Sequence, residues 1–174
     1  MTDEMTNGPG NTLGNGAGDD TGTAMPPLKL LTQYLKDLSF ENPGAPMVHM
    51  LRGEVPRAQL TLDVRARTIA PMQYEVSLVL GISAQREQET VYLVELEYAG
   101  LFDVTGVEEE HVTPLLMIEA PRLLFPFARE VLAKATHDGG YPPVMLNPID
   151  FLAVFREQMK RREAESGGLG VANA

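Results

Sequence analysis

Cysteine and tryptophan are absent from this 174-residue sequence, and aromatic residues make up only 6% of it. Without cysteine the chain forms neither a disulfide framework nor a thiolate metal site, which is compatible with a reducing cytosol. No apolar run approaches the roughly 20 residues that a membrane-spanning helix needs, and the N-terminal residues lack the apolar stretch of a signal peptide. We therefore expect a cytoplasmic protein without direct membrane insertion.

Basic residues are scarce, with 14 Lys and Arg against 24 Asp and Glu and a net charge of −10. Residues 28–155 hold seventeen acids and ten bases, so the acidity lies mainly in the part of the chain that is expected to fold. Because clustered cations are needed to bind a phosphate backbone, this balance disfavours nucleic acid and favours a basic protein partner.

The two ends of the chain carry little that could be buried. Residues 1–27 are rich in Gly, Asn, Thr and Asp, which predicts a disordered N-terminal tail. The glycines of "GNGAGDDTG" lack the Lys-Ser/Thr, the strand and the helix of a phosphate-binding loop. Residues 163–174 are expected to form a flexible C-terminal tail, which leaves 28–162 as one folded domain.

The first half of this domain is patterned as strands. The segment 28–47 looks like an extended segment or short edge strand stopped by Asn42-Pro43-Gly44, and a further short extended piece over 98–107 is broken by Gly100 and Gly106. Apolar and polar residues alternate in three successive segments with short links, at 58–69, 73–85 and 89–98. This arrangement predicts an antiparallel meander within a four-stranded sheet.

The second half is patterned as helices. The acids before His111 indicate a helix start, and an apolar helical period continues to Gly139-Gly140, with Pro121 and Pro126 expected to break or kink the helix. Asp150 is expected to cap a last helix with a basic C-terminal half. Strands followed by helices predict an α+β fold, with the helices packed on one face of the antiparallel sheet.

Titratable side chains do not gather into a recognisable catalytic site. The three histidines fall on separate segments, and Leu115 stands four residues after His111, where a helical zinc site needs a second histidine. Glu95 and Glu97 form a carboxylate pair, but they alternate with large apolar residues and no base or oxyanion donor accompanies them. We therefore predict that the protein is not an enzyme.

Four strings of residues together resemble one known family. "YLKDLSFENPGAP", "YAGLF", "APRLLFPFAREVL" and "GGYPPVMLNPIDFLAVF" are similar to the bacterial protein-export chaperone SecB, in order over about residues 31–158. The chain departs from the family in its longer N-terminal tail and in "VHMLRGEVPRA", which has Met50 and Leu51 where members often carry an aromatic residue.

The resemblance implies a SecB-like domain over 28–162, assembled as a homotetramer that is a dimer of dimers, with no cofactor. It implies an ATP-independent holdase that binds unfolded precursor proteins, keeps them competent for translocation and delivers them to the SecA motor. The alternative is a SecB-like chaperone that serves another client system, such as an antitoxin.

The resemblance also implies two sets of site residues. Carried over by position, the acidic SecA-binding set is Asp37, Glu41, Leu93 and Glu95. The expected client-binding set consists of apolar residues near the loop between the first two strands and on the helices: Met50, Leu51, Leu60, Leu62, Phe125, Phe127, Phe151 and Phe155.

Overall fold

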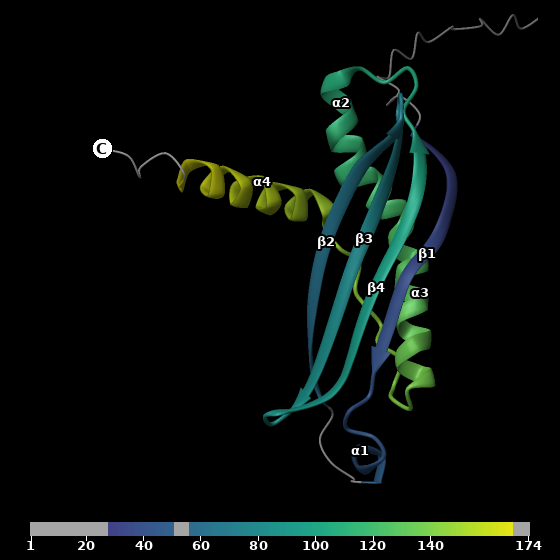
Figure 1. Ribbon diagram of the computed structural model, residues 1–174, viewed down its shortest axis with the longest axis vertical. Coiled ribbons are helices and arrows are strands. Elements are labelled where there is room, and N and C mark those ends of the chain that lie inside the picture. The colour runs from purple at the N-terminus through teal and green to yellow at the C-terminus, as the bar shows by residue number, and fades with distance from the viewer. Residues whose placement is uncertain (1–27, 51–55, 169–174) are drawn as a thin grey trace, which may run out of the picture.

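The computed structural model describes residues 28–50 and 56–168 and contains one four-stranded antiparallel sheet with helices on one face (Figure 1). The spatial strand order is β1-β4-β3-β2, so the first strand of the chain pairs with the last. The strands are β1 Lys29–Glu41, β2 Arg57–Ala70, β3 Gln73–Arg86 and β4 Glu89–Asp103. The expected α+β class is confirmed, and the expected tails at 1–27 and from residue 169 onward lie outside the described residues.

The meander of β2, β3 and β4 is confirmed, with one difference at Gly100. The sequence indicated a break there, whereas β4 continues without interruption to Asp103. A Cβ at position 100 would lie 2.9 Å from side-chain atoms of both Leu124 and Phe102. The glycine therefore serves the close approach of the helix layer and does not end the strand.

β1 is an edge strand, as expected, but it is 13 residues long and two irregularities interrupt its pairing with β4. One of them lies between Leu35 and Asp37. A bulge inserts an extra residue, so the alternation of side chains changes phase at that point. Tyr34 and Lys36 face away from the helices before the bulge, and Asp37 and Ser39 face the same way after it. This change of phase explains the irregular alternation in the sequence of this segment.

The helices are α1 Met47–Met50, α2 Glu109–Pro114, the π-helical turn η1 Leu115–Glu119, α3 Ala120–Asp138 and α4 Phe151–Gly168. α2, η1 and α3 follow one another along the chain without a gap. Pro121 stands in the first turn of α3, directly after η1, and α3 continues past Pro126. Because proline lacks the N–H that would donate to the preceding turn, the hydrogen-bond ladder is irregular at this point. The irregular stretch of this helical region is therefore η1, and α3 does not end at either proline.

α4 begins after Asp150, as the sequence predicts. The carboxylate of Asp150 accepts hydrogen bonds from the backbone N–H of Leu152 at 3.0 Å and of Ala153 at 3.1 Å. The helix extends beyond the expected domain boundary, because residues 163–168 are helical where a flexible tail was expected. Glu and Ala in this stretch favour helix, which gives a local reason for the extension.

The core lies between the sheet and the helices. α3 runs along one face of the sheet, and α4 projects beyond the β2 edge (Figure 1). Fully buried apolar side chains of both layers meet between them: Leu78, Leu80, Leu96, Phe102, Leu124 and Leu132. No helix among the described residues covers the other face of the sheet, which we call the outer face (Figure 1).

Candidate functional site

Neighbouring strands bring the predicted acidic set together on the outer face. β1 and β4 pair so that Ser39 is opposite Glu95 and Glu41 is opposite Leu93, while Asp37 is opposite the next outward residue of β4. Val94 and Leu96 are buried toward the helices, so the residues that alternate with them face outward. Asp37, Glu41, Leu93 and Glu95 thus form one continuous surface, which we call the docking row.

The carboxylates of the docking row are not neutralised by the described part of the protein. Asp37, Glu41 and Glu95 are exposed, and within residues 28–50 and 56–168 none of them forms an ion pair. Leu93 is partly exposed between them. Unpaired carboxylates around an apolar side chain give a surface that attracts cations over a distance and offers a small apolar contact at close range.

A second group of charges occupies the outer face beside the docking row, and no pattern in the sequence predicts it. Glu75 of β3 is only 5% exposed. Its carboxylate accepts hydrogen bonds from the Tyr34 hydroxyl at 2.6 Å, from Lys36 Nζ at 2.7 Å and from Arg67 at 2.9 and 3.0 Å. Lys36 Nζ also lies 2.9 Å from Glu97 Oε1. These five side chains, which we call the paired cluster, tie all four strands together.

The paired cluster keeps its carboxylates ionised. Hydrogen bonds from Arg67, against the opposing effect of burial, and then from Lys36 and Tyr34, lower the pKa of Glu75 to about 2. The pKa of Glu97 is lowered by a hydrogen bond from Ser77 and then by one from Lys36. Alternation along β3 alone suggests that Glu75 lies on a solvated strand face. It does not reveal the burial of Glu75, because the partners come from other strands, up to 41 positions away in the sequence.

The predicted client-binding residues do not form one continuous site. Met50, at the end of α1, is 74% exposed, and Leu60 on β2 is also exposed, whereas Leu62 is partly buried against the core. Leu51 lies outside the described residues. These residues belong to the segment that connects β1 to β2 and to the first half of β2, which we call the crossover.

The four predicted phenylalanines separate into two kinds. Phe125 and Phe151 are 7% and 1% exposed, and their rings meet edge to face with centroids 6.0 Å apart, so both belong to the core. We correct the prediction for this pair, because buried rings offer no surface to a client. Phe127 is 44% exposed and stacks on Tyr98 at 6.4 Å. Phe155 is partly buried beside a cavity.

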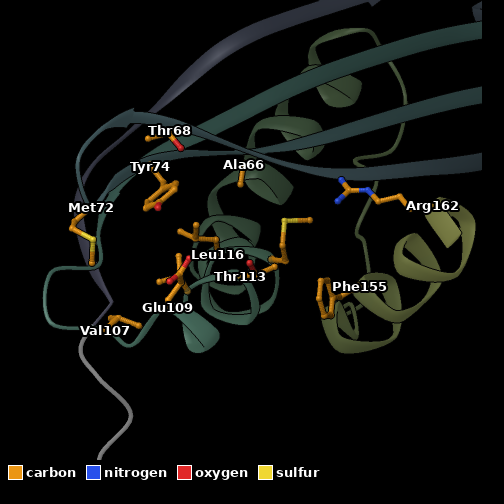
Figure 2. Close-up of a pocket in the computed structure, with 12 residues that line it drawn as sticks. Ala66, Thr68, Met72, Tyr74, Val107, Glu109, Thr113, Leu116, Phe155 and Arg162 are labelled. Carbon is orange, nitrogen blue, oxygen red and sulfur yellow. The ribbon is translucent and has the colours of Figure 1, made fainter. Parts of the chain in front are cut away.

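That cavity has a volume of about 530 Å³ and lies between the sheet, α2, η1 and α4. Figure 2 shows Ala66, Thr68 and Tyr74 of the sheet across from Leu116, with Phe155 and Arg162 entering from α4. Its lining mixes apolar side chains with the polar groups of Thr68, Glu109, Thr113 and Arg162. A mixed lining of this kind can contact both apolar and polar side chains of a bound chain.

Aromatic and polar contacts attach the crossover to the end of α3. The Asn42 amide donates to the carbonyl of Gly139 at 3.1 Å and accepts from the Tyr141 hydroxyl at 2.6 Å. The Tyr141 ring lies 4.6 Å from Tyr92 and 4.9 Å from His49. The sequence predicts a turn at Asn42-Pro43-Gly44 and a helix end at Gly139-Gly140, and the folded chain brings these two segments together.

One group of titratable side chains among the described residues lies close enough together to bind a metal ion. Glu108, Glu110 and His111 lie close together at the start of α2, but all three are exposed, and surface acids gather in this way without a metal. Among the described helices, none is both long and apolar enough to cross a membrane.

Comparison with known proteins gives consistent results. A family model described as "Preprotein translocase subunit SecB" matches residues 21–162. "Protein-export protein SecB" of Maricaulis maris is 46% identical over 154 residues, which cover 88% of this chain and 90% of the relative. The protein of the same name from Bradyrhizobium sp. strain BTAi1 is 44% identical over 157 residues, covering 90% and 96%.

A solved structure shares the fold. It is the Mycobacterium tuberculosis Rv1957 SecB-like chaperone, in complex with a ChAD peptide from the Rv1956 HigA1 antitoxin. The TM-score is 0.60 at 19% sequence identity, and the match covers 70% of this chain and 90% of that one.

Proposed function

This chain belongs to the SecB family of preprotein translocase subunits, and we infer that it is a protein-export chaperone that binds unfolded precursors without ATP and passes them to the SecA motor. The observation that carries this proposal is the agreement between the family match over residues 21–162 and the docking row on the outer face. The two SecB relatives at 44% and 46% identity favour export over an antitoxin client, since the antitoxin-bound neighbour shares the fold alone.

SecA is proposed to dock on the outer face through a basic segment. The unpaired carboxylates of Asp37, Glu41 and Glu95 steer such a segment toward the sheet, and Leu93 provides an apolar contact within the same surface. The helix layer lies on the opposite side of the sheet (Figure 1). Docking of SecA on the outer face therefore leaves the helix side of the sheet open to clients.

Clients are proposed to bind on apolar surface of the crossover and the helix layer. Met50, Leu60 and Phe127 are exposed, and Phe155 adds a partly buried ring beside the cavity. An unfolded chain presents many apolar side chains, so burial against flexible Met and Leu side chains favours binding without a strict sequence requirement. This mechanism requires neither nucleotide nor cofactor.

We propose a homotetramer, formed as a dimer of dimers in the cytoplasm. β1 is an edge strand, and an exposed edge with apolar side chains is a surface that proteins cover by association. Large apolar side chains are exposed along this edge and on the adjoining α3: Leu30, Leu31, Leu35, Leu38 and Leu123. The outer face stays free when a second copy covers this edge.

The proposal is tested by measuring SecA binding and client holding on the same protein. We expect Glu95→Lys to weaken binding of the basic C-terminal segment of SecA by roughly tenfold, because it places a cation in the docking row. Native mass and the delay in refolding of a slow-folding precursor should be unchanged, with and without ATP. Glu108→Lys, an equal change of charge at the exposed start of α2, is the control.

Two results would contradict this function. Equal SecA affinity of wild type and Glu95→Lys at physiological salt would remove the docking assignment. A delay in precursor refolding that appears only with ATP would contradict the passive holding mechanism.

A further inference from the structure

The outer face of the sheet is divided into two electrostatically different parts, and Lys36 lies where they meet. On one side, the paired cluster joins Glu75 and Glu97 to cations within 3 Å. On the other side, the docking row holds Asp37, Glu41 and Glu95 without a cation among the described residues. The boundary falls between Glu97, which is paired, and Asp37, which is directly opposite it on β1.

The irregularity in β1 is what places Lys36 at this boundary. The pairing with β4 moves from Leu35 to Asp37 and leaves Lys36 as the extra residue. The side chains of Lys36 and Asp37 therefore both lie on the outer face, although the two residues are consecutive in the chain. Nζ of Lys36 points toward Glu75 at 2.7 Å and Glu97 at 2.9 Å.

Without Lys36, the row of carboxylates would be longer. Glu97 follows Leu93 and Glu95 on β4, with its side chain on the same face as Glu95. Lys36 is the one described residue that forms an ion pair with Glu97, while Arg65 and Arg67 act on Glu97 only over a longer distance. Glu75, in contrast, keeps its two hydrogen bonds from Arg67. Loss of the lysine charge would thus release Glu97 while Glu75 stays paired.

We propose that Lys36 is a specificity-determining residue of the docking surface, which neutralises Glu97 and thereby limits the footprint of a Lys/Arg-rich partner segment to Asp37, Glu41 and Glu95. The inference rests on the proposed docking function and adds the extent of the site to it. A limited footprint discriminates between partners, because a longer acidic row would attract cationic chains of many kinds. Lys36 itself stays charged, since hydrogen bonds to Glu75 and then Glu97 raise its pKa.

The test measures how tightly a labelled Lys/Arg-rich peptide without acidic residues binds to the full chain. Lys36→Gln should bind this peptide roughly three- to fivefold more tightly than wild type at low salt, with a steeper loss of affinity as salt rises. The double variant Lys36→Gln/Glu97→Gln should return to the wild-type affinity, because it removes the carboxylate that the first change releases. Lys36→Arg should also behave as wild type.

Lys134→Gln is the matched control. Lys134 pairs with Asp138 at 2.6 Å on α3, so the substitution makes the same change in net charge on the other side of the sheet. We expect little change in affinity, because exposed charges separated by more than about 10 Å are largely screened at ordinary salt. Unfolding midpoints and native mass of all variants report whether the sheet is intact.

The outcomes separate the two proposals. If wild type does not bind the peptide, the docking function fails and this inference fails with it. If wild type binds but Lys36→Gln gains no affinity, or if the double variant keeps the gain, only the inference is overturned. Should Lys36→Gln fail to fold, Glu97→Gln alone decides: it leaves Lys36 in place with one anion fewer, and an affinity no lower than that of wild type would contradict the proposal.

Discussion

The two faces of the sheet hold their side chains in place by different means. The inner face is packed by large apolar residues such as Leu96 and Leu124, whose burial against α3 removes them from water. The outer face has no such layer among the described residues, and its central carboxylate, Glu75, is held by hydrogen bonds from side chains of two other strands, β1 and β2. Because the inner face supplies the apolar core, the outer face can carry charged and polar side chains.

The largest expected effect is on the inner face. Leu124→Ala should lower the free energy of unfolding by about 3 kcal/mol, because it removes a fully buried side chain and leaves a cavity in the core. Urea unfolding at one fixed protein concentration measures this, since association also contributes to stability. Met145→Ala, at an exposed loop position, should cost less than about 1 kcal/mol. Equal losses in the two variants would show that the inner face is not the dominant core.

A smaller effect is expected on the outer face, and it depends on pH. The pKa of Glu75 is lowered to about 2 in the folded protein, from an ordinary value of 4.5. A lowered pKa stabilises the fold above the unfolded value, and this contribution disappears as the pH falls from 4.5 toward 2. We expect it to be about 2 kcal/mol, less than the full shift implies because Arg67 is largely exposed.

Glu75→Gln isolates this contribution. The variant should be less stable than wild type at pH 6, and the difference should shrink on acidification toward pH 2, because wild type then loses the same charge. Other carboxylates titrate alike in both proteins and cancel in the comparison. A difference in the free energy of unfolding that does not change with pH would mean that Glu75 acts by shape and not by charge.

The smallest expected effect is at the crossover, which begins where β1 ends. Tyr141→Phe keeps the ring contacts but removes the hydroxyl that donates to Asn42, and should cost about 1 kcal/mol. Hydrogen exchange should accelerate at the backbone N–H of Gly44, which donates to the carbonyl of Val91 on β4, and at that of Val48, which donates to the carbonyl of Gly44.

Tyr74→Phe is the control for the crossover. The Tyr74 hydroxyl makes no hydrogen bond within the described residues, so its loss should leave exchange at Gly44 and Val48 unchanged. If both variants accelerate exchange equally, the Asn42–Tyr141 contact does not hold the crossover in place.

Sequence patterns recovered the elements whose cause is local. Alternation placed Leu93 and Glu95 of β4 on one face and Val94 and Leu96 on the other, and Asp150 was identified as a helix cap. Strings of residues identified the family. Periodicity did not reveal the bulge at Lys36. One extra residue reverses which side chains face each side of the strand, so the sequence pattern of a bulged strand looks merely irregular.

The sequence by itself thus determined the α+β class, the meander, the family and the outward placement of Leu93 and Glu95 on β4. Only the tertiary structure decided that Glu75 is buried among partners from two other strands, that Phe125 packs on Phe151, and that Tyr141 holds Asn42. The reason is physical. Periodicity reports the environment of neighbours along the chain, whereas these contacts join positions up to 99 residues apart, which only the pairing of strands and the seating of helices bring together.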